Sequence, residues 1–265
     1  MPPSKPPPKK KFEEFPRVSG RVHRLKDGRI SRFGWKAQKA TLREFTLTAC
    51  ANEFGLNVPG HPQSVAPYKT KHETRGPDMS GKQADALVAY VKSLLPPVQQ
   101  KPKEPQAAKI VEAGEKLFEI TGCAACHSPN VGKTKGVFSD FLLHDLGEHL
   151  QASGHYGATL VPHETTDPET GASDFPDDEP TARTKKLPGP SPSEWRTPPL
   201  WGVRDSAPYL HDGRAATLEQ AIAFHGGEAS DASIRFFMLS SKKRQRLVAF
   251  LKTLRAPEVQ AIKRT

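Results

Sequence analysis

The sequence predicts an all-α protein with long loops, and three observations support this fold class. Apolar residues recur at helical spacing in several segments. Residues suited to helix N-caps stand immediately before three of these segments, at Thr41, Ser80 and Thr217. Hydrophobic residues make up only 35% of the chain, which contains 26 prolines, so much of the remainder is expected to be loop.

The N-terminal part of the chain contains two of the expected helices. The first follows Thr41 and continues to about residue 54. The second follows Ser80, covers about 81–95, and ends at a pair of prolines, which cannot continue a helix. Between them, residues 55–78 are rich in proline, glycine and histidine and are expected to be a loop.

The C-terminal part contains three more expected helices. They cover about 107–120, Thr217 to His225, and about 241–254. Gly122 is expected to end the first of them. Two further segments are expected to be more extended: residues 138–150 form a strand or a short helix, and residues 195–201 form a rigid extended segment.

A C-x-x-C-H motif follows the 107–120 helix directly. One helical turn separates Cys123 from Cys126, so both thiols can bond to one edge of a haem while the adjacent His127 binds the iron. A structural zinc site would need two more ligands at similar spacing, and the remaining cysteine, Cys50, is distant. A thioredoxin-like C-x-x-C would lie in a βαβ context, which is absent. The motif therefore predicts one covalent haem c, which would also add apolar surface to a small core.

The formal net charge of +10 narrows the expected partners. A basic surface can attract nucleic acid, an anionic membrane or an acidic protein. No aromatic-basic nucleic-acid motif stands out, so no nucleic-acid partner is expected, and an acidic redox partner protein or plain solubility is favoured. No stretch is apolar for about 18 residues, so no transmembrane helix is expected. Covalent haem predicts a periplasmic protein, although residues 1–11 lack the apolar region of a signal peptide.

An internal repeat relates the two parts of the chain. LVAYVKSL at 87–94 matches LVAFLKTL at 247–254, and A-T-L at 40–42 matches A-T-L at 216–218 at the start of an expected helix. One interpretation is that amphipathic helices simply look alike. The other is a duplicated domain, whose first copy would lack its opening helix and its C-x-x-C-H motif. Those elements would lie before the first residue of this chain.

The repeat and the composition divide the chain into four expected regions. They are a basic extended or disordered segment (1–31), a partial domain without its haem motif (32–97), a linker rich in proline and lysine (98–106), and a domain with covalent haem (107–257). Within the last region, residues 151–194 have no clear periodicity and include an acidic stretch over 164–179. We expect residues 151–194 to be a long surface insertion.

Three stretches carry a family resemblance. RTPPLWGV (196–203) and APYLHDGRAATLE (207–219) resemble the di-haem oxidoreductases related to bacterial di-haem cytochrome c peroxidases. RFGWKAQKATLREFTLTACANEFG (32–55) resembles the peroxidatic half of the same family. The resemblance covers most of residues 20–257 and implies two cytochrome c-like domains, each with a haem. This chain has one C-x-x-C-H motif, so a second haem is expected on a missing N-terminal part.

The resemblance also implies site residues in the haem domain. In the related peroxidases an axial ligand lies fourteen positions after the histidine of the P-Y-x-H-D-G motif, which leads from His211 to His225. His211 itself and Met238 are the alternatives. With His127 and His225 on its two faces, the iron would be closed to peroxide and would serve electron transfer. Arg196 is expected either to pair with a haem propionate or to be solvated.

In the N-terminal part, the resemblance matches Glu53 to a catalytic glutamate and Trp35 to the tryptophan between two haems. Cleaving an O–O bond at a haem needs an open iron position and an acid-base group nearby. Phe45 stands where the related enzymes have a glutamine, and this departure weakens the peroxidase interpretation. The alternatives are a surface carboxylate for Glu53 and a core aromatic for Trp35. His144 and His149 suggest a metal pair, but a structural role is favoured.

The leading interpretation is therefore a c-type haem oxidoreductase that transfers electrons as part of a di-haem, peroxidase-like enzyme acting on hydrogen peroxide. One alternative is a mono-haem electron carrier without catalysis, in which residues 1–97 form an accessory cap. Another is a haem-based sensor or binding module. The three differ in haem count, in iron ligation and in their response to peroxide or to a diatomic gas.

Overall fold

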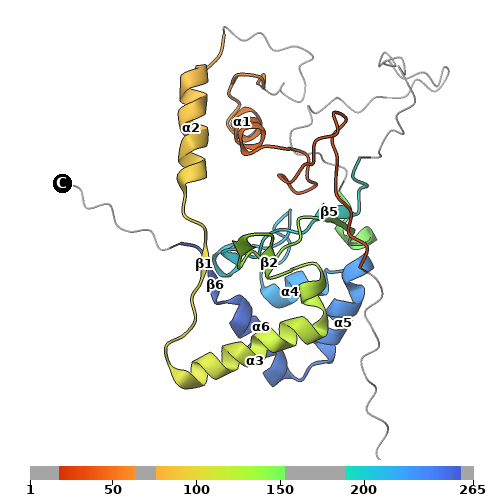
Figure 1. Ribbon diagram of the computed structural model, residues 1–265. Coiled ribbons are helices and arrows are strands. Elements are labelled where there is room, and N and C mark those ends of the chain that lie inside the picture. The colour runs from red at the N-terminus through yellow and green to blue at the C-terminus, as the bar shows by residue number, and fades with distance from the viewer. Residues whose placement is uncertain (1–17, 64–75, 153–188, 258–265) are drawn as a thin grey trace, which may run out of the picture.

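The computed structural model describes residues 18–63, 76–152 and 189–257, and these are mainly helical (Figure 1). The helices are α1 (Leu42–Glu53), α2 (Gly81–Ser93), α3 (Pro105–Thr121), α4 (Leu218–Ala223), α5 (Ser230–Met238) and α6 (Ser241–Leu251). The expectation of a helical fold is confirmed in this main feature. None of the helices in the described ranges has the length and apolar character that crossing a bilayer requires.

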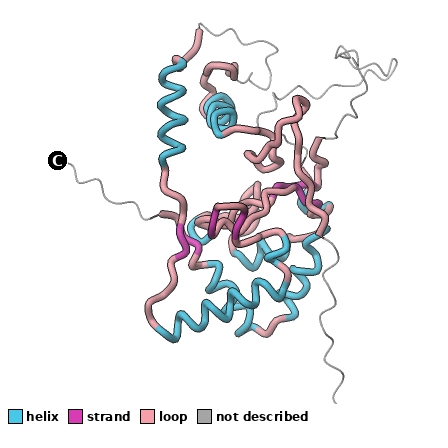
Figure 2. The backbone as a smooth tube through the Cα atoms, in the orientation of Figure 1, coloured by secondary structure: helices cyan, strands magenta, loops and turns pink. Residues whose placement is uncertain are grey.

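Three short antiparallel ladders accompany the helices. They pair β1 (Val98–Gln99) with β6 (Leu254–Arg255), β2 (Asn130–Val131) with β3 (Thr134–Lys135), and β4 (Leu143–Asp145) with β5 (Glu194–Arg196). Most of the remaining backbone is loop (Figure 2). This agrees with the high proline content, because proline removes the backbone N–H that a helix or a central strand would use.

The helix starts follow from local hydrogen bonds. Thr41, Ser80 and Thr217 each accept a hydrogen bond from the backbone N–H three residues later, and the side chain there reaches back to form a capping box. Pro105 begins α3 because its missing N–H costs nothing in the first turn. Gly122 ends α3 with φ 97°, a left-handed conformation that glycine adopts without strain.

Several element boundaries differ from the expectation. Helix α4 ends at Ala223, two residues before His225, and the nine-residue helix α5 was not expected. The start of α5 has no side-chain cap, so the sequence offers no start signal there. The 138–150 segment contains both β4 and a 3₁₀ turn, Glu148–Leu150. Within the expected linker, β1 pairs with β6, although the division into domains stays a prediction.

The described helices form two groups of unequal core size. Helix α3 packs across α6, and their apolar faces join α4 and α5 in one cluster that includes Phe118, Phe236, Leu247 and Phe250. The α1–α2 pair encloses only a small cluster of four buried residues, Leu47, Cys50, Val58 and Ala84. Figure 1 shows α1 and α2 in the upper part of the molecule and α3 to α6 in the lower part.

The segment before α1 connects the two groups. Arg21 forms an isolated bridge with Leu143 of β4, so the described part of the expected 1–31 segment is extended and docked. The backbone N–H of Arg196 in β5 donates to the carbonyl of Trp35 at 2.9 Å. These bonds hold the 18–40 segment beside β4 and β5. Residues 1–17 and the acidic stretch over 164–179 lie outside the described residues.

Candidate functional site

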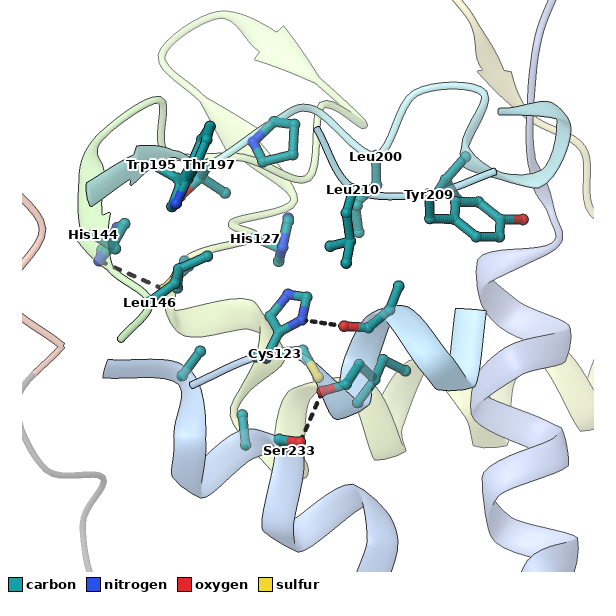
Figure 3. Close-up of a pocket in the computed structure, with 18 of the residues that line it drawn as sticks. Cys123, His127, His144, Leu146, Trp195, Thr197, Leu200, Tyr209, Leu210 and Ser233 are labelled. Carbon is teal, nitrogen blue, oxygen red and sulfur yellow. Dashed lines mark hydrogen bonds between the residues drawn. The ribbon is translucent and has the colours of Figure 1, made fainter. Parts of the chain in front are cut away.

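A cavity of about 450 Å³ lies between α3, α4, α5, α6 and the loop that follows β5. Its wall is largely apolar, with contributions from Phe118, Leu200, Leu218, Ile222, Leu247 and Leu251. Figure 3 shows Trp195, Leu200 and Tyr209 on one side of it and Ser233 on the other. The volume and the apolar wall are typical of a site for a cofactor of drug-like size.

The C-x-x-C-H motif lines this cavity. The turn at Gly122 leads directly into a 3₁₀ helix, Cys123–Ala125, so that Cys123, Cys126 and His127 reach the same cavity wall. The Nδ1–H of His127 can donate to the carbonyl oxygen of Phe138 at 3.0 Å, which leaves Nε2 as the metal-binding atom. Burial lowers the pKa of His127 to about 4, so its imidazole is neutral near pH 7.

His225 lines the same cavity just after α4. Its Nδ1 lies 2.8 Å from the carbonyl oxygen of Ala221, the same arrangement that holds His127, and burial lowers its pKa. Of the two alternative ligands, Met238 is 80% exposed at the end of α5 and does not line the cavity. His211 does line it, but its ring stacks on Trp195 with 4.0 Å between ring centroids.

A buried polar cluster supports the motif from behind. The ring nitrogens of His144 lie 2.9 Å from Asp140 Oδ2 and 3.0 Å from Glu228 Oε2. Burial opposes the charged imidazole, but these hydrogen bonds and the neighbouring Cys126 raise the pKa of His144 to about 11. His144 Nδ1 is also 3.8 Å from Cys126 Sγ. The cluster therefore holds His144 beside Cys126. His149, in contrast, is exposed, so the structure places the two histidines in different environments.

Arg196 brings a partly buried positive charge to the cavity. Its Nε–H donates to the carbonyl oxygen of Gly34 at 2.9 Å, and burial lowers its pKa to about 10. Among the described residues, no carboxylate lies within ion-pair distance of its guanidinium. A partly buried guanidinium that is hydrogen-bonded to backbone carbonyls is suited to an anionic group of a ligand in the cavity.

A second, smaller cavity of about 160 Å³ adjoins the first. It is lined by Gly34, Trp35, Phe45, Glu53 and Arg196. Trp35 and Arg196 line both cavities, and the Trp35 side chain is 42% exposed. The structure thus brings Glu53 and Trp35 together beside Arg196. Trp35 is at the boundary between the two cavities rather than in a core.

The residues of the larger cavity fit a c-type haem. Two thiols stand beside a neutral imidazole, a second imidazole lines the same space, and the remaining wall is largely apolar. Burial raises the pKa of Cys123. Thioether formation adds the sulfur and the hydrogen of a thiol across a vinyl group, and both thiols of the motif line the cavity where that group would lie. A zinc site is a poorer match, because no group of three or more metal-ligating side chains occurs in the described ranges.

Sequence reasoning missed two features of this region, the carboxylate partners of His144 and the burial of Lys36. Asp140 and Glu228 are distant in sequence from each other, and nothing in the sequence pairs them with His144. Lys36 is 1% exposed, and its Nζ donates to three carbonyl groups at 2.8–2.9 Å while lying 4.0 Å from the centroid of the Trp195 ring. Burial lowers the pKa of Lys36 to about 8. A lysine between a tryptophan and an alanine gave no signal of such burial.

Comparisons with known proteins find similarity to a di-haem oxidoreductase family model and to cytochrome c peroxidases. Residues 180–254 match the family model of the di-haem oxidoreductases. The cytochrome-c peroxidase IdrP2 of Pseudomonas sp. strain SCT is 29% identical over 272 residues, covering 92% of this chain and 68% of that protein. The cytochrome c551 peroxidase of Nitrosomonas europaea is 31% identical over 142 residues, covering 53% of this chain and 33% of its own length.

A solved structure also resembles this chain. It is that of a MauG-like protein associated with microbial copper homeostasis, with 21% identity and a TM-score of 0.47. The matched part covers 88% of this chain and 76% of that one.

Proposed function

Because this chain is related to the di-haem oxidoreductases and cytochrome c peroxidases, we propose that it is a c-type haem oxidoreductase. The observation that carries the proposal is that Cys123, Cys126, His127 and His225 line the same largely apolar cavity. When bound there, a haem supplies an iron that takes up and releases one electron. The protein around it holds, orients and shields that group.

In this proposal the Nε2 atoms of His127 and His225 would hold the iron. The carbonyls of Phe138 and Ala221 hold both Nδ1 atoms, so each ring is fixed in the tautomer that a metal ligand requires. Two histidine ligands would close the iron to peroxide. The role of the larger cavity is therefore electron transfer, and Arg196 would pair with a propionate of the bound group.

Peroxide chemistry is proposed for the side of the molecule that carries Glu53. Trp35 lines both cavities and would serve as the electron relay between them, while the carboxylate of Glu53 would move a proton between the peroxide oxygens. The repeat supports an open iron position there. His225 is eight positions after the capping residue Thr217, and the residue eight positions after Thr41 is Ala49, which has no ligand atom.

The second haem would be held by polypeptide that carries its own C-x-x-C-H motif. An acidic redox protein is the proposed electron donor, since the net charge of this chain is +10. Haem attachment through thiols places the proposed site of action in the periplasm.

Haem attachment is tested by expressing the chain together with a cytochrome c maturation system in a bacterial periplasm. Cys123→Ala and Cys126→Ala are each expected to abolish the normal two-bond attachment. The readout is either loss of haem stain on a denaturing gel or, where one thioether bond still forms, a shifted pyridine-haemochrome spectrum. Cys50→Ala is the matched control, because Cys50 lies in the small α1–α2 cluster. Normal attachment in both motif variants would contradict the proposal.

The axial ligand is tested by exchanging each candidate histidine for methionine. His225→Met is expected to keep haem attached, to raise the reduction potential and to alter the low-spin spectrum. His211→Met is the matched variant, since His211 lines the same cavity, and it should leave the spectrum unchanged. The opposite pattern would assign the ligand to His211.

Peroxide turnover separates the proposed enzyme from an electron carrier. The presence of one C-x-x-C-H motif favours a mono-haem carrier as the second candidate. A two-haem preparation from the native host should reduce peroxide with a reduced cytochrome as donor, and Glu53→Gln should remove most of that turnover while keeping both haems. A single reversible redox step with no spectral response to peroxide would identify the carrier instead.

A further inference from the structure

His144 of β4 connects the two chain segments that present the candidate iron ligands. One segment follows the C-x-x-C-H motif and contains Phe138, whose carbonyl oxygen lies 3.0 Å from Nδ1 of His127. The other segment follows α4 and contains His225, which lines the same cavity. Figure 3 shows the ring of His144 at the edge of the cavity, to one side of His127. The ring is therefore placed to bond to both segments.

The first connection joins His144 to the segment that orients His127. His144 Nε2 lies 2.9 Å from Asp140 Oδ2, two residues after Phe138. Phe138 has φ 49° and Phe141 has φ 59°, left-handed conformations that a residue with a side chain adopts only where its surroundings hold it. The bond between His144 and Asp140 is one of the interactions that hold this segment. It therefore supports the position of the carbonyl group that His127 uses.

The second connection joins His144 to the segment that begins at His225. His144 Nδ1 lies 3.0 Å from Glu228 Oε2, three residues after His225. The intervening chain packs directly on β4, because a Cβ atom built on Gly227 would be 2.2 Å from the carbonyl oxygen of Asp145. The hydrogen bond of Glu228 therefore fixes a segment that already lies against the strand carrying His144.

The two connections act through one buried ring. A carboxylate oxygen accepts hydrogen bonds, and an imidazole ring with a proton on each nitrogen can donate to Asp140 and Glu228 at the same time. Gly20 packs on the ring, since a Cβ atom built there would be 2.3 Å from Cε1 of His144. The His144 side chain is 3% exposed, so water competes little for either bond.

We propose that His144 is a positioning residue for the iron ligands. It joins the segment that orients His127 to the segment that carries His225, with a carboxylate at each end of the connection. This inference rests on the proposed function, because it concerns the residues that would hold the iron. His225 depends more on the connection, because it lies outside regular secondary structure. His127 directly follows Cys126, which would be bonded to the haem.

The test produces the full chain with a cytochrome c maturation system and measures CO binding to the reduced protein by absorption spectroscopy. CO needs an open iron position, so the unsubstituted chain should stay low-spin and bind little CO. His144→Leu should keep its covalently attached haem and bind CO about 10- to 100-fold more tightly, because a released His225 frees that position. The matched control is His23→Leu, which removes another buried histidine that does not line the cavity.

A second pair of variants isolates the connection to His225. Glu228→Ala removes the acceptor of His144 Nδ1 and should raise the affinity for CO as His144→Leu does. Glu228→Gln keeps an oxygen acceptor at this position and should stay close to the unsubstituted chain. This pair decides the question if His144→Leu yields no folded, haem-loaded protein.

Three outcomes have distinct meanings. Unchanged CO affinity in haem-loaded His144→Leu or in Glu228→Ala would overturn the positioning proposal. An equal rise in His23→Leu would also overturn it, because general destabilisation would then explain the effect. Tight CO binding by the unsubstituted chain would instead overturn the proposed ligation by two histidines, on which this inference rests.

Discussion

The α1–α2 pair and the α3–α6 group are built from matching sequence pieces, but they enclose cores of different size. Both contain a helix that begins with a capped A-T-L sequence. Both also contain one of two similar octapeptides, LVAYVKSL (87–94) or LVAFLKTL (247–254). The second group buries eleven apolar residues in one cluster, and the first buries four. The difference is the helix α3, which has no described counterpart beside α2. Similar sequences therefore form a helix in both groups, whereas the burial of that helix depends on the helices packed against it.

The two groups also differ in the chemistry that they offer. The α3–α6 group supplies two thiols and two imidazoles around one apolar cavity. The α1–α2 pair supplies Glu53 beside Trp35, and it has Ala49 where the other group has His225. In the proposed function, an iron held by two histidines in one group and the carboxylate of Glu53 in the other would separate electron transfer from the reaction with peroxide.

The largest difference in the destabilisation caused by a substitution is expected between Phe250 and Tyr90, which occupy equivalent positions of the two octapeptides. Phe250→Ala should destabilise the haem-loaded protein by about 3–5 kcal/mol, because it leaves a cavity in a packed core. Tyr90→Ala in the isolated chain should change stability by about 0.5 kcal/mol or less, since Tyr90 is 63% exposed. Urea unfolding followed by far-UV circular dichroism measures both. Similar costs at the two positions would show that Tyr90 is covered in solution.

A smaller difference in the free energy of unfolding is expected between alanine substitutions at two helix glycines, Gly114 of α3 and Gly81 of α2. Gly114→Ala should cost about 1–3 kcal/mol, because the added methyl group would overlap the backbone of α6. Gly81→Ala at the start of α2 has no atom within 4 Å of the added group and should be neutral or stabilising by up to about 1 kcal/mol. The same unfolding experiment compares them. A tolerated Gly114→Ala would mean that α3 and α6 cross less closely than the structure indicates.

A third prediction concerns the ion pair that links the N-terminal segment to β5. Arg21 donates two hydrogen bonds to Glu194, at 2.5 and 2.7 Å, and these lower the pKa of Glu194 to about 2. Because the folded-state pKa lies below the ordinary value near 4.5, the pair stabilises the protein above that pH and loses its effect as pH falls toward 2.

Glu194→Gln should remove that part of the acid dependence and cost about 1–2 kcal/mol at neutral pH, a value reduced for the partial exposure of Arg21. The control is Asp85→Asn, which breaks the exposed Arg43–Asp85 pair inside the α1–α2 group and should have little effect. Unfolding measured from pH 2 to 7 tests both variants. An unchanged pH profile in Glu194→Gln would show that the link contributes nothing to folding stability.

The smallest contrast is expected at the caps, where the two groups are alike. Thr41→Ala and Thr217→Ala should each cost about 1 kcal/mol, because each removes a capping box of the same geometry. Thermal unfolding of the two variants under one set of conditions compares them. A cost at Thr217 well above that at Thr41 would show that α4 also depends on the haem that His225 binds.

The features that could be predicted from the amino-acid sequence are those whose interactions join residues close together in the chain. The caps at Thr41, Ser80 and Thr217 follow from hydrogen bonds that span three residues. The C-x-x-C-H motif after Gly122 is equally local, because one turn of backbone sets the spacing of its thiols. These features could be predicted because their physical causes lie within a few residues of each other.

Contacts between residues that are far apart in the sequence could be identified only in the folded structure. It brings His225 to the cavity of His127, sets His144 between Asp140 and Glu228, and lays Trp35 along β5. Each of these depends on chain segments that are far apart in sequence and pack together only in the folded state. The same holds for the octapeptide, which is buried in α6 and exposed in α2. Burial is a property of the neighbours that remove water from a side chain, and the sequence of the segment does not contain them.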